Sequence, residues 1–216
     1  MMQTILIAVL TAAQAYLLGS VDTGILISKF VYHDDVRNHG SGAAGMTNML
    51  RTFGKKAAAL TAAGDVLKGV AAVCIGRWLF HFLPADAGLS AWLGVYLAAI
   101  LAVVGHLKPL YFGFKGGKGV LVGAVMLAFF DWRVFGIAFL LFVLAVALTK
   151  WISLGSILGA ISFPITTWVF YRDPVLTAMA AGMAAVVVFM HRSNIGRIIH
   201  GKENKFSFKS KKTMSD

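Results

Sequence analysis

The chain alternates long apolar blocks with short polar connectors, and its hydrophobicity does not follow the two-residue alternation of a strand. A helix that crosses the hydrocarbon core of a bilayer needs about 20 apolar residues. The third and fourth blocks are on the short side of this length. The pattern predicts about seven membrane-spanning helices, over residues 3–30, 57–83, 89–105, 116–131, 133–149, 152–171 and 174–190.

Composition agrees with this pattern, because 58% of the residues are hydrophobic and only 13% are charged. A water-soluble globule carries about twice that share of charge. The lone Cys74 excludes a disulfide framework and a multi-cysteine metal site. No Lys or Arg precedes Lys29, so the first block lacks the positive start of a signal peptide and is expected to be a retained helix. We therefore expect an all-α integral membrane protein.

Positive charge is concentrated in the longer connectors. Lys and Arg number 20 against nine Asp and Glu, which gives a net charge of +11. The connectors at 31–56 and 106–119 and the tail from 191 hold most of it, whereas the opposite side has only Arg77, Arg133 and Arg172. The positive-inside rule then places the N-terminus outside and the C-terminus in the cytoplasm. Lipid headgroups, nucleic acid and a phosphorylated substrate are the anionic partners that this charge can meet.

The first long connector holds more glycine and hydroxyl groups than a plain turn requires, with the sequence RNHGSGAAGMTNMLR from Arg37 to Arg51. Glycines let successive backbone N–H groups face one point, and arginine supplies charge for a phosphate or carboxylate. One interpretation is an anion site. The other is a turn whose arginines contact lipid headgroups.

The second long connector runs into an apolar helix as FKGGKGV, residues 114–120. Its N–H groups, the positive end of the helix and two lysines can converge on one phosphate. It is not a Walker A loop, because Gly113 and Gly117 enclose three residues and Gly119 replaces the magnesium-binding Ser or Thr. Nucleotide hydrolysis is therefore not expected, and a tight helix start is the plain alternative.

The start of the tail carries a third polar group. His191, Asn194 and Arg197 recur at three-residue spacing on one helix face, Glu203 follows, and His106 leaves the third span on the same side. This set lacks the further carboxylate or histidine that a metal site needs, so no metal is expected.

Charged residues also lie inside the predicted spans, where they are costly unless paired or hydrated. Asp22 lies in the first span, and Asp65 and Lys68 are one turn apart in the second. The latter two form either a structural ion pair or part of the wall of a substrate site.

Taken together, these segments resemble the bacterial membrane-integral glycerol-3-phosphate acyltransferases that use acyl phosphate as donor, the PlsY family. The matching stretches occur in the family's order: GS at 19–20, RNHGSGAAGMTNMLRTFGKKAA from Arg37, DVLKG from Asp65, GHLKPLYFGFKGGKGV from Gly105 and HRSNIGRIIHGKEN from His191. The resemblance implies a seven-helix protein of the bacterial inner membrane whose active site faces the cytoplasm. We expect one transmembrane domain over residues 1–205 and a basic tail over 206–216.

The resemblance also implies the reaction and its residues. An acyl group passes from acyl phosphate to the 1-hydroxyl of glycerol 3-phosphate, giving lysophosphatidic acid and phosphate, with no cofactor, metal ion or nucleic acid and with membrane lipids as neighbours. The expected catalytic residues are Ser41, Lys118, His191 and Asn194. The expected substrate- and phosphate-binding residues are Arg51, Lys68, His106, Lys115, Gly116, Gly117 and Gly119.

The chain departs from the family's pattern at several positions. Family members have Asn at the position of Ala43, Ala at that of Met46, Ala-Thr at Leu121-Val122 and a Pro near Asp22. The change at Ala43 removes a polar group from the first connector.

Three questions stay open at the level of sequence. Ser41 is either a nucleophile or, as we favour, a hydrogen-bonding group, because no adjacent base is assured. His39, His191 or the donor phosphate could accept the hydroxyl proton. Basic loops and intramembrane charges also suit a transporter of a phosphorylated metabolite, although two matching halves are not seen.

A second acyltransferase pattern is present by chance. His81 and Asp86 match the H-x-x-x-x-D motif of acyl-CoA-dependent enzymes, but a proline interrupts it and the pair falls on the outer side.

Overall fold

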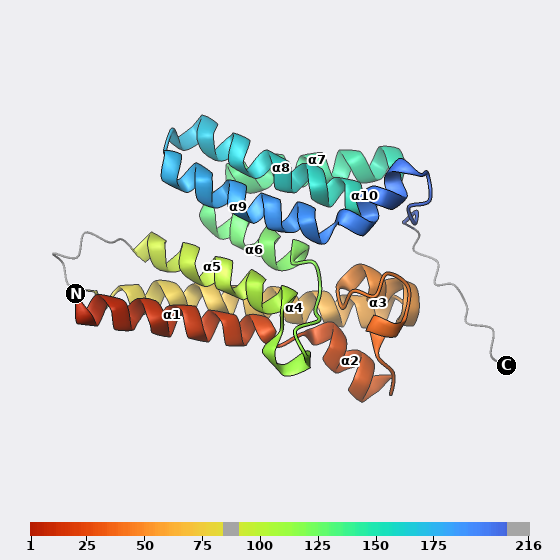
Figure 1. Cartoon of the computed structure of the whole chain (residues 1–216), viewed down its shortest axis with the longest axis horizontal. Helices are drawn as coiled ribbons and strands as arrows, with labels where there is room; N and C mark the ends of the chain where they lie inside the picture. The colour runs from red at the N-terminus through yellow and green to blue at the C-terminus, as the bar shows by residue number, and fades with distance from the viewer. Residues whose placement is uncertain (84–90, 207–216) are drawn as a thin grey trace. The chain divides into compact units, whose positions relative to one another are not determined.

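A computed structural model describes residues 1–83 and 91–206, and these residues form helices and connecting loops without a strand. They divide into two compact units, Met1–Phe129 and a second unit from Phe130 onward. Figure 1 shows the helices of both units.

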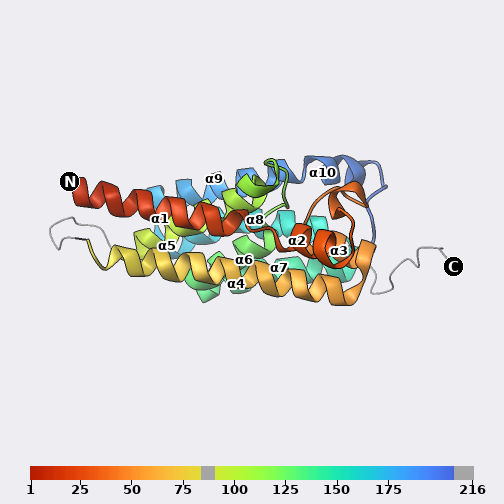
Figure 2. The ribbon, with the colours of Figure 1, turned by 90° about the horizontal axis from the view of Figure 1, so that it is seen from below.

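The first unit is built on three long helices that lie side by side, α1 (Met2–Ser20), α4 (Lys55–Phe80) and α5 (Ala91–Leu107), as Figures 1 and 2 show. Small residues let their backbones approach closely, as is common in membrane helices. A Cβ on Gly19 would overlap the carbonyl of Ala102, and one on Gly105 would overlap that of Tyr16. The shorter elements of this unit are α2 (Thr23–Val31), η1 (Val36–Asn38), α3 (Met46–Phe53), η3 (Leu110–Phe112) and α6 (Val120–Phe130), the last of which leads into the second unit.

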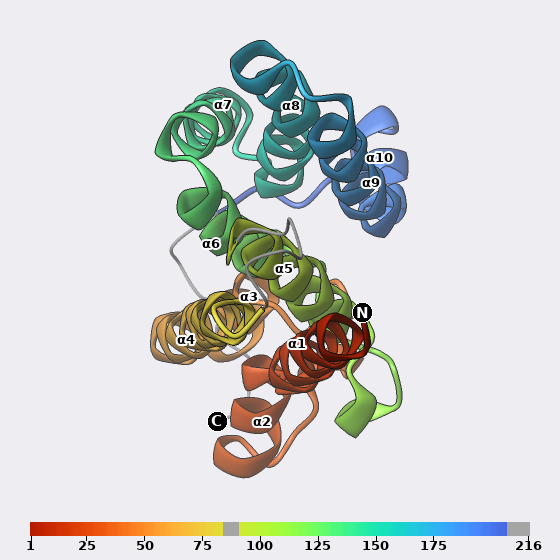
Figure 3. The ribbon, with the colours of Figure 1, turned by 90° about the vertical axis from the view of Figure 1, so that its left-hand side faces the viewer.

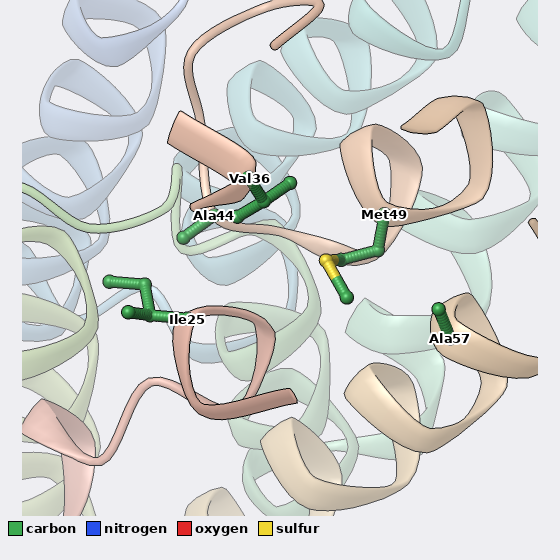
Figure 4. Packing of buried hydrophobic residues seen from close by; sticks show 5 residues of the cluster. All are labelled: Ile25, Val36, Ala44, Met49 and Ala57. Atoms are coloured by element: carbon green, nitrogen blue, oxygen red, sulfur yellow. The ribbon is translucent and has the colours of Figure 1, made fainter. Parts of the chain in front are cut away.

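The first predicted span is broken at Val21 and Asp22, between α1 and α2. The Asp22 side chain accepts a hydrogen bond from the backbone N–H of Ile25 (3.2 Å) and so caps α2. Beyond this break a small apolar core joins α2, η1, α3 and the start of α4. Figure 4 shows its members, which are Ile25, Val36, Ala44, Met49 and Ala57.

The second unit contains α7 (Trp132–Thr149), α8 (Ile152–Tyr171), α9 (Pro174–Met190) and α10 (Arg192–Ile199), and Figure 3 shows the first three end-on in a row. Asp131 joins the ends of α7 and α8, because it accepts hydrogen bonds from Arg133 (Nη2, 2.7 Å) and from the Tyr171 hydroxyl (2.6 Å). The hydrogen bonds from Arg133 hold the pKa of Asp131 far below its usual value.

The prediction of an all-helical membrane protein is confirmed, whereas the predicted number of spans is not. Five helices in the described residues are long and apolar enough to cross a membrane, and α9 with α10, bent by 60°, gives a sixth. Predicted blocks 133–149, 152–171 and 174–190 match α7, α8 and α9 to within a residue. The fourth block yields only α6, whose 11 residues span about 16 Å.

Candidate active site

Asn48 organises the first connector. Its side chain is 2% exposed, and the two N–H groups of Nδ2 are shared among the carbonyls of Val36 (3.0 Å), His39 (2.9 Å) and Ala43 (2.9 Å). Its Oδ1 accepts from the backbone N–H of Ser41 (3.0 Å). One buried amide therefore satisfies four backbone groups of an irregular loop, which otherwise could not leave water without penalty.

Two glycines make this loop geometry accessible. Gly40 and Gly42 have φ values of +56° and +70°, in the left-handed region that favours glycine. A Cβ on Gly40 would also overlap Asn48 Oδ1. The Ser41 side chain, partly buried, is thus presented from a turn of fixed shape.

Arg37 connects the first connector to the second. Its Nη1 donates to the carbonyls of Phe112 (2.8 Å) and Lys115 (3.1 Å). Its Nε and Nη2 bind Asp35 (2.9 and 2.6 Å), and these hydrogen bonds lower the pKa of Asp35 to about 2. The carboxylate of Asp35 fixes the guanidinium, which in turn holds the second loop by two carbonyl groups.

The glycine loop, residues 116–119, packs its backbone against the end of α5. The N–H of Gly117 donates to the carbonyl of His106 (3.0 Å). A Cβ on Gly116 would overlap that carbonyl, and one on Gly117 would overlap Nε2 of the His106 ring. Gly119 has φ +75°. Glycine is therefore required here for close approach as well as for conformation.

The two lysines of this segment differ in burial, since Lys118 is partly buried and Lys115 is exposed. Arg51 is partly buried in the last turn of α3.

Beneath the glycine loop, four ionisable side chains form a buried cluster: Asp22, Asp65, Lys68 and His106. Each is at most 6% exposed. Lys68 Nζ lies 2.8 Å from Asp65 Oδ1 and 2.9 Å from His106 Nδ1, and it donates to the carbonyl of Val21 (2.9 Å). His106 Nδ1 lies 3.8 Å from a carboxylate oxygen of Asp22. The spacing left open whether Asp65 and Lys68 form an ion pair or line a substrate site; the structure shows the ion pair, together with contacts to the other two residues that the spacing did not indicate.

In the second unit, the Glu203 carboxylate accepts hydrogen bonds from polar side chains of the tail and of α8. Its Oε1 accepts from Asn194 Nδ2 (2.8 Å) and Ser153 Oγ (2.8 Å), and its Oε2 accepts from Arg197 Nε (2.8 Å). Nδ1 of the buried His191 lies 2.8 Å from the carbonyl of Val187. Because a carbonyl only accepts, Nδ1 carries a proton, and the ring orientation is fixed. The side chains of His191 and Asn194 are therefore held in place before any substrate binds.

The structure connects some of the predicted residues within each unit. In the first unit Arg37 joins the loops that carry Ser41 and Lys118, and Lys68 contacts His106. His191 and Asn194 belong to the second unit. The sequence did not indicate the roles of Asn48 or Ser153, because both depend on contacts that only the fold creates. Asp86, the second residue of the H-x-x-x-x-D motif, lies outside the described residues.

Glu203 generates a stability prediction with a defined pH dependence. Burial alone raises the pKa of Glu203, but the hydrogen bonds from Asn194, Ser153 and Arg197 lower it below its usual value overall. Such a carboxylate stabilises the fold above its unfolded pKa and loses that effect as the pH falls through the lower folded value. We expect Glu203→Gln to lower the thermal unfolding midpoint in detergent by several degrees at pH 7, and by less at pH 4.

Asp173→Asn is the matched control, because Asp173 caps α9 by accepting from two backbone N–H groups and Asn caps as well. Its midpoint should change little. An equal difference between wild type and Glu203→Gln at both pH values would contradict the assigned role of the charge.

Comparison with known proteins places the chain among acyltransferases. A family model described as Glycerol-3-phosphate acyltransferase matches residues 9–201. The glycerol-3-phosphate acyltransferase of Thermoanaerobacter sp. (strain X514) is 40% identical over 206 residues, covering 94% of this chain and 98% of the relative. That of Clostridioides difficile (strain 630) is 39% identical over 201 residues, covering 93% and 96%.

Two crystal structures of PlsY (YgiH), an integral membrane glycerol 3-phosphate acyltransferase, have the same fold. The glycerol 3-phosphate form matches with a TM-score of 0.81 at 32% identity, and the lysophosphatidic acid form with 0.77 at 31%. Both matches cover 93% of this chain and 96% of the other. The resemblance seen in the sequence is thus confirmed, and the chain belongs to the glycerol-3-phosphate acyltransferase family.

Proposed function

We propose that this protein transfers an acyl group to the 1-hydroxyl of glycerol 3-phosphate and releases lysophosphatidic acid, in bacterial phospholipid synthesis. The observation that carries the proposal is the family match over residues 9–201, which includes both long connectors and the start of the tail. The two solved structures that share the fold are the glycerol 3-phosphate form and the lysophosphatidic acid form of PlsY. This match favours an acyltransferase over the transporter that composition alone left open.

The donor in this proposal is acyl phosphate, whose phosphate group is held by the glycine loop and Lys118. Support comes from the fixed backbone of residues 116–119 and from the lysine within it. A small dianion suits such a loop at a helix start. Arg51 is the proposed partner of the glycerol 3-phosphate phosphate group.

The chemistry requires orientation more than a strong base. The hydroxyl oxygen of glycerol 3-phosphate attacks the acyl carbon, and the carbon–oxygen bond to phosphate breaks with its electron pair leaving on phosphate. The hydroxyl proton passes to that phosphate or to a histidine. Since the donor is already activated, the protein mainly aligns the hydroxyl and stabilises negative charge on the carbonyl oxygen and the leaving phosphate. Ser41 is proposed to supply a hydrogen bond to this negative charge.

Lys118 and Lys115 provide a matched test of the phosphate site. Charge-assisted hydrogen bonds are worth about 1.5–3 kcal/mol, so Lys118→Ala should lower kcat/KM for acyl phosphate about tenfold or more. Lys115→Ala should cause a smaller loss, because its side chain is exposed and its carbonyl contact with Arg37 is kept. The assay follows incorporation of labelled glycerol 3-phosphate into lysophosphatidic acid by purified protein in detergent. Equal, near-wild-type activity of both variants would remove the phosphate site from this loop.

A second test concerns the donor. We expect turnover with acyl phosphate and none with acyl-CoA, because connectors of about 30 residues or fewer leave no folded module for a nucleotide. His81→Ala should keep near-normal activity, whereas His191→Ala should lose it. Turnover of acyl-CoA that disappears in His81→Ala and survives in His191→Ala would overturn both the donor and the site.

We also propose that the loops around Ser41, Lys118 and Asn194 face the cytoplasm, with the N-terminus outside, as the charge asymmetry indicates. Single cysteines at the exposed positions His39, Lys115 and Lys202, in a Cys74→Ala background, should resist an impermeant thiol reagent added to intact cells. A cysteine in place of the exposed Arg172 should react, as the matched control. Labelling of any of the first three from outside would refute this topology.

A further inference from the structure

The buried ionic cluster is placed where it can act on the glycine loop without touching substrate. Its members come from the α1–α2 break, from α4 and from the end of α5, and all are at most 6% exposed. His106, the member from α5, is in contact with the loop through both its backbone carbonyl and its ring. The cluster thus lies behind the loop.

Lys68 makes two hydrogen bonds and one ion pair inside the cluster. An ammonium group has three N–H donors and no acceptor. Three partners lie within 2.9 Å of Nζ, which are the Val21 carbonyl, Asp65 Oδ1 and His106 Nδ1. A phosphate would have to displace one of them from a buried site. Lys68 is therefore better suited to fix His106 than to bind an anion.

The same contact determines the state of the His106 ring. Because the ammonium of Lys68 can only donate, Nδ1 accepts, and the ring proton lies on Nε2. Nε2 faces Gly117, where a methyl group would overlap it. The ring is thus fixed on one side by Lys68 and fills the space behind the loop on the other.

We propose that His106, held by Lys68 and Asp65, is a positioning residue that sets the place of the Gly116–Gly119 loop and so of Lys118, and is not itself a phosphate ligand. This rests on the proposed function of the loop as the phosphate site for the donor. It assigns Lys68 and His106 to the support of that site.

A double-mutant cycle tests the contact directly. Gly117→Ala forces the loop away from the ring and should raise KM for acyl phosphate about tenfold, with a smaller effect on KM for glycerol 3-phosphate. His106→Asn keeps an acceptor for Lys68 but removes the ring edge. In the double variant the new methyl group has room, so at least half of the loss, on a logarithmic scale, should be recovered. Gly123→Ala is the control, because nothing lies within 4 Å of its added Cβ.

The outcomes are distinguishable when Lys118→Ala and the thermal midpoints are measured in the same series. If Lys118→Ala leaves KM for acyl phosphate unchanged, the proposed phosphate site fails. If Lys118→Ala raises it but the Gly117→Ala loss is simply additive with that of His106→Asn, the positioning role is overturned. A shift of thermal midpoints without any change in either KM would also overturn it, since it would indicate a role in stability alone.

Discussion

One buried ammonium group, Nζ of Lys68, joins the segments on which the two loops of the first unit depend. It bonds the chain at the α1–α2 break through Val21, its own helix through Asp65, and the end of α5 through His106. Removing one partner from such a charge leaves the others buried and uncompensated, which is far more destabilising than the net worth of the intact pair. The arrangement is therefore retained as a unit, and it fixes where α5 ends and the second connector begins.

The loops themselves are held by polar contacts and glycines in place of a large apolar core. Asn48 hydrogen-bonds to four backbone groups of the first connector, and Arg37 donates to two carbonyls of the second. The apolar cluster beside them has only five fully buried members, two of which are alanine. Buried polar networks of this kind define one geometry when fully satisfied. That suits loops which must present Ser41 and Lys118 in fixed places.

Much of the helical architecture could be predicted from apolar block length, because the bilayer dictates it. Blocks 133–149, 152–171 and 174–190 became α7, α8 and α9 almost unchanged. The break at Val21 and Asp22 was missed because apolar residues continue on both sides, and only the capping by Asp22 reveals it. The helix of the fourth predicted block, α6, begins at Val120 and not at residue 116, because the glycines before it pack against His106.

Candidate site residues could be named from the sequence, but most of the contacts among them could not be predicted. Local spacing paired Asp65 with Lys68, yet nothing in the spacing shows that Lys68 also reaches Val21 and His106, 47 and 38 residues away in the chain. The Glu203 contacts with Asn194 and Arg197 are local, whereas that with Ser153 spans 50 residues. Contacts over such separations depend on helix packing, which one sequence does not specify.

The bridge from Arg37 to the second connector has a thermodynamic consequence. Because one guanidinium is bonded to Asp35 on one loop and to the carbonyls of Phe112 and Lys115 on the other, neither loop can shift without straining or releasing those bonds. A ligand that shifts one loop therefore changes the free energy with which a second ligand binds the other. Linkage makes this effect reciprocal: whatever factor the first ligand adds to the affinity for the second, the second adds to the affinity for the first.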